Sequence, residues 1–227
     1  ERAPGQRPAQ RAEQIVRQIA DVEIDDKISF VIKKTEEIME DSEYQGVRLS
    51  LDAYLDKTRI PLKIDISTGD VITPCEISFS YQLMFENRTI PLLAYPPETV
   101  LAEKLETILS RGEANTRLRD FYDVYILQRE DFVVTPDALC HALLATCRKR
   151  GHEDLLHTYA SILDRVRQSD TMRTQWMKYQ SDFDYAAGIT WDTVLDTVET
   201  LCMKTLDDHA FGDELPQEES QFEMHLL

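Results

Sequence analysis

Hydrophobic positions follow two different periods along this chain. Between residues 9 and 20 they recur at helical spacing, and between residues 28 and 32 they alternate as in a half-buried strand. Alternation returns over residues 47–55 and 61–66, with a short polar turn between these two segments. The order predicts a helix and then strands, the last two of which form an antiparallel hairpin.

The alternation also assigns each side chain of the second hairpin strand to one face. The face predicted to be buried holds Leu62, Ile64 and Ile66. Asp65 points the other way, although acidic residues are disfavoured within strands. Taken alone, Asp65 is better explained as an ion-pair partner of Lys63 or Arg48 across the hairpin than as a functional carboxylate.

From Pro96 onward the period lengthens to about 3.6 residues, which predicts helices. Pro97 suits the first turn of a helix, and Gly112 suits its C-terminal end. Further helices are predicted after Asn115–Thr116, from Pro136, and over residues 152–168 and 191–204. The predicted fold class is α+β, a mixed or antiparallel sheet with packing helices followed by a C-terminal helical bundle.

Composition sets the C-terminal end apart from the rest of the chain. The segment LDDHAFGDELPQEES, residues 206–220, carries six carboxylates and no Lys or Arg, so it cannot bury enough apolar surface to order itself. We therefore predict a sheet region at 1–93, a helical domain at 94–206, and an acidic, disordered tail at 207–227.

Charge and cysteine usage exclude several classes of protein. A formal net charge of −17 argues against a broad basic surface for nucleic acid. Because no segment is apolar enough for a membrane span or a secretory signal, and no cysteines are closely paired, we predict a cytoplasmic protein. The cysteines are interpreted as buried small hydrophobic residues: Cys75, Cys140, Cys147 and Cys202. The histidines lack metal-ligand spacing, and no Walker, GxGxxG or GxSxG motif is present.

Three charged residues stand out in the helical half. Lys104 falls within the apolar arc of the helix over residues 98–111, and Asp120 and Asp123 lie three apart in a helix that is apolar nearly all round. Buried carboxylates need a cation, which a lysine, an arginine or a metal could supply. Spacing alone leaves two interpretations equally open: a salt-bridge cluster that joins two helices, and a catalytic site.

The motifs around these residues resemble a known family. In AEKLETILSRGEANTRLRDFYDVYIL a Lys helix, an Arg-Gly-x-x-Asn-x-Arg turn and an Asp-x-x-Asp helix follow one another, as in the AbiEii/AbiGii-type nucleotidyltransferase toxins. LKIDISTGDVITP is similar to the preceding strand of that family, and the resemblance covers roughly residues 21–128. It implies the sheet and two-metal chemistry of the polymerase-beta-like nucleotidyltransferases.

The resemblance assigns roles residue by residue. Lys104, Asp120 and Asp123 match the family's catalytic motif, with Lys104 contacting the triphosphate and an aspartate orienting it or assisting proton transfer. Arg117 and Arg119 are candidates for phosphate binding, and Asp65 is similar to the most distal metal-binding carboxylate. The resemblance implies Mg²⁺, a nucleoside triphosphate, an acceptor such as tRNA, and a cognate antitoxin protein in a toxin–antitoxin or phage-defence system.

One departure from the family pattern shapes the functional hypotheses. The family's glycine-rich turn and paired Asp-x-Asp precede the helix that corresponds to residues 11–20, and neither is found here. We therefore expect an N-terminally incomplete sequence whose residues 1–93 are the C-terminal portion of the nucleotidyltransferase sheet, and which binds Mg²⁺ poorly as it stands. The leading hypothesis is a nucleotidyltransferase toxin. The alternatives are a truncated, inactive member with an interaction role, and a helical RNA-binding or partner-binding module.

Overall fold

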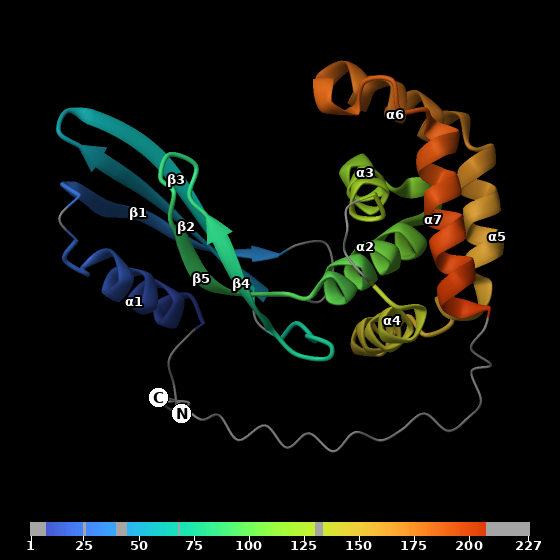
Figure 1. Ribbon diagram of the computed structural model, residues 1–227, viewed down its shortest axis with the longest axis horizontal. Helices are drawn as coiled ribbons and strands as arrows, with labels where there is room; N and C mark the ends of the chain where they lie inside the picture. The colour runs from blue at the N-terminus through green and yellow to red at the C-terminus, as the bar shows by residue number, and fades with distance from the viewer. Residues whose placement is uncertain (1–7, 25, 40–44, 68, 130–133, 208–227) are drawn as a thin grey trace. The chain divides into compact units, whose positions relative to one another are not determined.

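The structure is a computed structural model that describes residues 8–24, 26–39, 45–67, 69–129 and 134–207 (Figure 1). The chain divides into two compact units, Glu1–Asp70 and Val71–Leu227. The described residues form helices and two small antiparallel sheets, which confirms the predicted α+β class. The domain boundary expected near residue 93 stays a prediction, and the expected acidic tail lies, beyond Asp207, outside the described residues.

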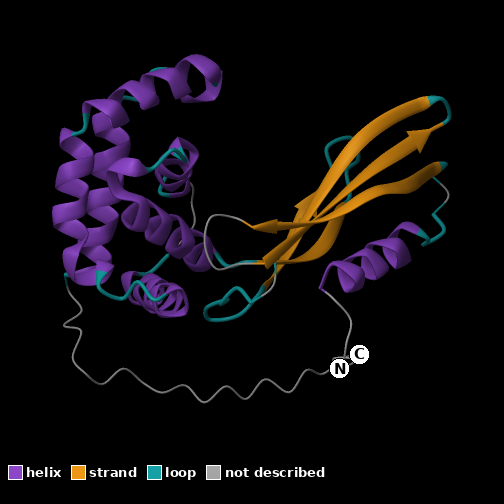
Figure 2. Ribbon diagram, turned by 180° about the vertical axis from the view of Figure 1, so that it is seen from behind, coloured by secondary structure: helices purple, strands orange, loops and turns teal. Residues whose placement is uncertain are grey.

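The first unit is a three-stranded antiparallel sheet with one helix on its face. The sheet order is β1 (Ile28–Met39), β2 (Gln45–Leu55) and β3 (Thr58–Ile66). Helix α1 (Pro8–Ala20) runs along this sheet (Figure 2). The helix, the following strand and the hairpin are therefore where the hydrophobic periods predicted them.

The core of this unit lies between α1 and the central strand. Ala12 and Val16 of the helix pack against apolar residues of β2, where Leu49 is fully buried. Thr35 of β1 adds a polar link, because its hydroxyl donates a 2.8 Å hydrogen bond to Oε2 of Glu13 on the helix.

The outer strand is less buried than its pattern predicted. Leu62 and Ile64 each keep 38% of their surface exposed, so the prediction that both are buried is wrong. They do lie beside Leu51 and Leu49 in the sheet register. However, β3 is an edge strand and α1 packs mainly on β1 and β2, which leaves the apolar row of the edge strand only partly covered. Ile66 is half-buried and packs against the core.

The second unit begins with a two-stranded hairpin and continues as helices. The hairpin pairs β4 (Ile77–Gln82) with β5 (Thr89–Ala94). The helices are α2 (Pro97–Arg111), α3 (Leu118–Leu127), α4 (Pro136–Arg150), α5 (Leu155–Gln168), α6 (Asp170–Asp182) and α7 (Trp191–Leu206), with short 3-10 turns η1 (Gly112–Ala114) and η2 (Asp184–Ala186). The predicted helical half is thus confirmed.

Helix α2 lies at the centre of this helical unit. It packs against α3, α4 and α5, and Leu101, Leu105 and Ile108 have no exposed surface. Trp176 and Trp191 are also buried. No described helix is both long and apolar enough to cross a lipid bilayer.

The cysteines follow the prediction with one exception. Cys140, Cys147 and Cys202 are buried free thiols, and burial raises the pKa of Cys147 and of Cys202 to about 12. Cys75, in contrast, is exposed, so its interpretation as a buried residue is wrong. It lies in the irregular segment before β4, where no helix or sheet face covers it.

Candidate functional site

A tight turn places helices α2 and α3 side by side. Gly112 ends α2 with φ 49° and ψ −131°, a conformation that favours glycine. Asn115 is fully buried, and its Oδ1 accepts a 2.7 Å hydrogen bond from the backbone N–H of Arg117. The turn itself therefore explains Gly112 and Asn115 of the Arg-Gly-x-x-Asn-x-Arg segment, whereas it does not require the arginine side chains.

Lys104 joins the two helices through both aspartates. Its Nζ lies 2.6 Å from Oδ2 of Asp123 and 3.2 Å from Oδ1 of Asp120. The side chain of Asp120 is 4% exposed, whereas those of Lys104 and Asp123 are 19% and 23% exposed. The three residues that the sequence singled out thus form one cluster, and two of them reach solvent.

Two arginines complete the Lys104 cluster, which we define as Lys104, Arg117, Arg119, Asp120 and Asp123. Nε of Arg117 lies 2.8 Å from Oδ2 of Asp120, although the N–H is not aimed for a hydrogen bond, and Nε of Arg119 lies 3.7 Å from Oδ2 of Asp123. Three cations therefore meet two carboxylates, and the cluster keeps an excess of one positive charge. Such an excess favours an anionic ligand.

The number of N–H donors on Lys104 also favours an anionic ligand. An ammonium group has three N–H donors, and the two aspartates take one each. The third donor can serve a phosphate oxygen without breaking either ion pair. A purely structural salt bridge between α2 and α3 would have the same distances, so geometry alone leaves both interpretations of the cluster open.

Asp65 lies in the other compact unit and has a partner of its own. Arg48 holds it in two parallel hydrogen bonds of 2.6 Å, from Nε to Oδ1 and from Nη2 to Oδ2. These hydrogen bonds hold the pKa of Asp65 below its ordinary value. The ion pair across the hairpin that the sequence favoured is therefore present in the structure.

The described residues do not fit a magnesium site. Magnesium needs several oxygen ligands in near-octahedral geometry. Within the described ranges no group of three or more His, Cys, Asp or Glu residues could hold a metal ion, and a guanidinium group occupies both oxygens of Asp65. No catalytic step can be derived through a metal ion from these residues.

Two further carboxylates are buried that the sequence analysis did not predict. Glu106 of α2 is 2% exposed and forms an ion pair with Arg150, while Nδ1 of His152 lies 2.7 Å from its Oε1. Asp52 of β2 is 4% exposed and lies 3.4 Å from the cationic nitrogens of both Lys33 and Arg59. For Glu106 the available signal was its place between Ala102 and Leu109, which lie one turn away on the same face of the helix.

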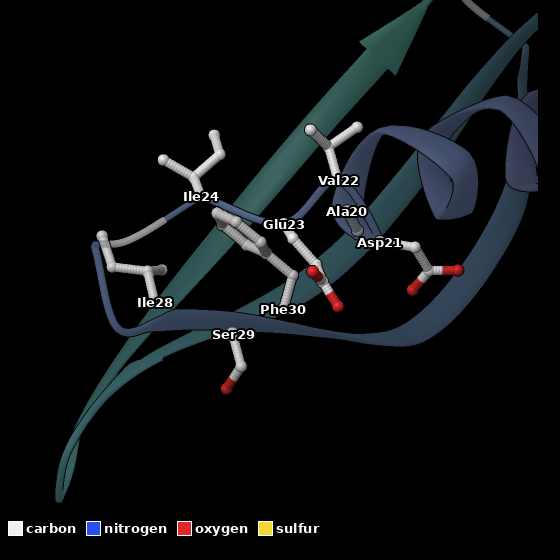
Figure 3. Close-up of a pocket in the computed structure, with 8 residues that line it drawn as sticks. All are labelled: Ala20, Asp21, Val22, Glu23, Ile24, Ile28, Ser29 and Phe30. Atoms are coloured by element: carbon white, nitrogen blue, oxygen red, sulfur yellow. The ribbon is translucent and has the colours of Figure 1, made fainter.

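A separate hollow of about 660 Å³ lies between the end of α1 and the start of β1 (Figure 3). Its lining combines apolar side chains such as Val22, Ile24 and Phe30 with the carboxylates of Asp21 and Glu23. None of the residues that the sequence singled out lies in it, and it offers no cationic side chain for a phosphate group.

Comparison with known proteins gives one result. The model of the nucleotidyl transferase AbiEii toxin family, type IV toxin–antitoxin system, matches residues 4–197, which extends beyond the segment of resemblance at residues 21–128. No curated protein and no solved structure matches the chain. The match takes in α1, both sheets and the helices as far as α7, including every residue of the Lys104 cluster. The chain therefore belongs to the family of AbiEii nucleotidyltransferase toxins of type IV toxin–antitoxin systems.

Proposed function

We propose that this protein transfers a nucleotide from a nucleoside triphosphate to an RNA acceptor such as tRNA, and that Lys104 binds the triphosphate. The observation that carries the proposal is the excess positive charge of the Lys104 cluster, together with the third donor of a partly exposed Lys104. In such a transfer an acceptor hydroxyl attacks the α-phosphorus and the bond to the departing pyrophosphate breaks. A fixed ammonium group stabilises the charge that develops on the phosphate oxygens.

The two aspartates have different roles in this proposal. Asp120 is too buried to reach a substrate, so it is a positioning residue that holds Lys104 while Arg117 balances its charge. Asp123 is more exposed, and it is the carboxylate able to assist the proton transfer from an acceptor hydroxyl. Arg119 is 77% exposed and supplies a second contact for phosphate.

Binding of inorganic tripolyphosphate and of nucleoside triphosphates, measured by isothermal titration calorimetry on the whole chain, tests the role of Lys104. Lys104→Met should weaken both ligands about tenfold or more, because a hydrogen bond to a charged group contributes about 1.5–3 kcal/mol. Lys104→Arg keeps the charge and should bind more tightly than Lys104→Met.

Glu106→Gln is the matched control for this experiment. It disrupts another ion pair of the same helix, one that is closed to solvent, and should leave tripolyphosphate affinity unchanged. If Lys104→Met lowers the melting temperature but binds tripolyphosphate like the wild-type protein, the Lys104 cluster is only a salt bridge between helices.

A second candidate function is an inactive family member that keeps a binding role. The ion pair of Asp65 with Arg48 favours it, because this pair removes one carboxylate from metal binding. Incubation with labelled nucleoside triphosphates, Mg²⁺ and tRNA separates the two functions. Label on the RNA supports transfer, whereas triphosphate binding without any label on the RNA supports the inactive member.

The type IV family also implies a cognate antitoxin. We propose a protein antitoxin encoded with this chain as its partner. Co-expression should restore the growth of cells that the chain alone inhibits, and a chain that does not inhibit growth would contradict its role as a toxin.

A further inference from the structure

Four aromatic side chains from α3, α6 and the η2 turn lie in contact with one another. The rings of Phe183 and Tyr185 stack at 5.4 Å and 29°, and the ring of Tyr185 lies 4.8 Å from that of Tyr122. Tyr179 joins them through a 3.0 Å hydrogen bond between its hydroxyl and that of Tyr185. We call Tyr122, Tyr179, Phe183 and Tyr185 the aromatic group.

The outer rings of the aromatic group are partly exposed. Phe183 is 42% exposed and Tyr185 is 52% exposed, whereas the neighbouring aromatic residues Phe121 and Trp176 are almost completely buried. Packing of the helical core therefore does not account for the two outer rings. A stacked pair of exposed rings at a turn is a surface onto which another flat ring can stack.

The aromatic group adjoins the Lys104 cluster. Arg119, Tyr122 and Asp123 lie three and four residues apart on α3 and so share one face of the helix. Burial raises the pKa of Tyr122, and Tyr185 and the charge of Asp123 raise it further. The same neighbours act on Tyr179, where burial raises the pKa, Tyr185 and Asp123 add to the rise, and Arg119 opposes it. Arg119 and Asp123 therefore lie on the face of α3 that carries Tyr122, whose ring in turn contacts the outer ring of Tyr185.

Charge limits what the outer rings can bind. Asp182 and Asp184 flank Phe183 and are exposed, so they repel phosphate groups on that side. The ligand must therefore place a neutral, flat part on the rings and its negative charges toward Arg119 and Lys104. A nucleobase attached to its phosphates has this distribution of charge, whereas a lipid headgroup layer or an acidic peptide does not.

We infer that Phe183 and Tyr185 form a stacking platform for an unpaired nucleobase whose phosphates reach the Lys104 cluster. The inference rests on the proposed function for the position of the phosphates, and it adds the site of the base. Stacking on aromatic side chains accepts any base, since every base has a flat π-face. The platform is therefore expected to increase affinity with little selectivity among the four bases.

The test compares ligands that share a triphosphate group and differ in having a nucleoside attached to it. Affinities for the four nucleoside triphosphates and for tripolyphosphate are measured by calorimetry on the whole chain carrying Phe183→Leu or Tyr185→Leu. Each substitution keeps an apolar side chain but removes the ring, so triphosphate nucleotides should bind about tenfold more weakly. Tripolyphosphate affinity should not change. Tyr185→Phe keeps the ring and should bind nucleotides like the wild-type protein.

A matched control is available on another surface. Tyr81 of β4 is 46% exposed, close to the value for Tyr185, and Tyr81→Leu should leave every affinity unchanged. Thermal unfolding of each variant shows whether the fold is intact. The inference is overturned if the platform variants fold but bind both nucleotides and a short single-stranded oligonucleotide as the wild-type protein does, or if they weaken tripolyphosphate and nucleotides equally.

Two further results separate this inference from the proposed function. If Lys104→Met leaves tripolyphosphate binding unchanged while Tyr185→Leu still weakens nucleotides, the platform stands and the role of Lys104 fails. A short single-stranded oligonucleotide identifies the source of the base. Weakened oligonucleotide binding with unchanged nucleotide binding supports a platform for the acceptor strand, and no change with either ligand rejects the platform.

Discussion

Replacing Glu106 by glutamine should destabilise the helical unit. Glu106 lies on α2, and its carboxylate accepts a hydrogen bond from Nη1 of Arg150 at the end of α4 and lies beside Nδ1 of His152. The side chains of Glu106 and Arg150 are 2% and 18% exposed, so solvent screens the pair only weakly. Glu106→Gln keeps the shape of the side chain and removes the charge that compensates the guanidinium group.

The magnitude follows from this burial. Breaking a buried ion pair by removing one partner costs about 3–5 kcal/mol, because the remaining charge stays in a poorly solvated place. Glutamine still offers one acceptor, and His152 is 40% exposed and can turn to water, so the loss should be near the lower limit, about 3 kcal/mol. For a protein of this size that corresponds to a fall in melting temperature of about 6–12 °C.

Urea unfolding followed by tryptophan fluorescence measures the loss, since Trp176 and Trp191 both lie in the helical unit. The double substitution Glu106→Leu and Arg150→Met replaces both charges by apolar groups and should be less damaging than Glu106→Gln alone. A loss below about 1 kcal/mol for Glu106→Gln, or a double variant that is less stable than the single one, would refute the reasoning from burial.

Three other predictions concern separate parts of the chain. Because Arg48 lowers the pKa of folded Asp65, the pair adds stability above the ordinary aspartate pKa of about 4, and this stability is lost as the pH falls through the lower folded value. Arg48→Met should raise the pKa of Asp65 in an NMR titration and reduce the loss of folding stability at acid pH. An unchanged pKa would contradict the ion pair. A thiol reagent should label Cys75 alone in the native protein and all four cysteines after unfolding; fast native labelling of a second thiol would show that the helical core opens. Gly112→Ala should cost about 1–3 kcal/mol through its positive φ, since the added methyl meets only an ordinary contact with Ile162, and a neutral effect in urea unfolding would mean that the turn can adjust.

The sequence predicts the elements of this protein better than their burial. The hydrophobic period located α1, the β2–β3 hairpin and most of the helices, although it did not predict α6, because each pattern reflects the local geometry of one element. The same pattern shows which face of β3 holds Leu62 and Ile64, but whether another element covers that face depends on where α1 packs. The prediction that Cys75 is buried was wrong for the same reason, since apolar neighbours in the sequence do not imply that another element covers the residue.

The candidate site was predictable where its residues are close in sequence. Asp120 and Asp123 share a helix, and a short turn brings that helix to Lys104, so spacing made Lys104 one of the cations expected to compensate the two aspartates. The pairing of Glu106 with Arg150 joins residues 44 apart, and only the packing of α2 on α4 brings them into contact. In the aromatic group, Tyr179, Phe183 and Tyr185 are close in sequence, but only the packing of α3 brings Tyr122 to them.

Helix α2 carries two ion-pair clusters two residues apart, and the contrast between them separates structure from candidate function. Glu106 is enclosed, and Arg150 and the imidazole of His152 each contact one of its two oxygens, so both oxygens of the carboxylate already have a protein partner. Lys104 is partly exposed, retains a donor, and belongs to a cluster with more positive than negative charge. A fold needs only the first arrangement to join its helices. The second arrangement leaves one positive charge uncompensated beside exposed aromatic rings. This is unfavourable for the fold unless an anionic ligand with a flat ring binds there.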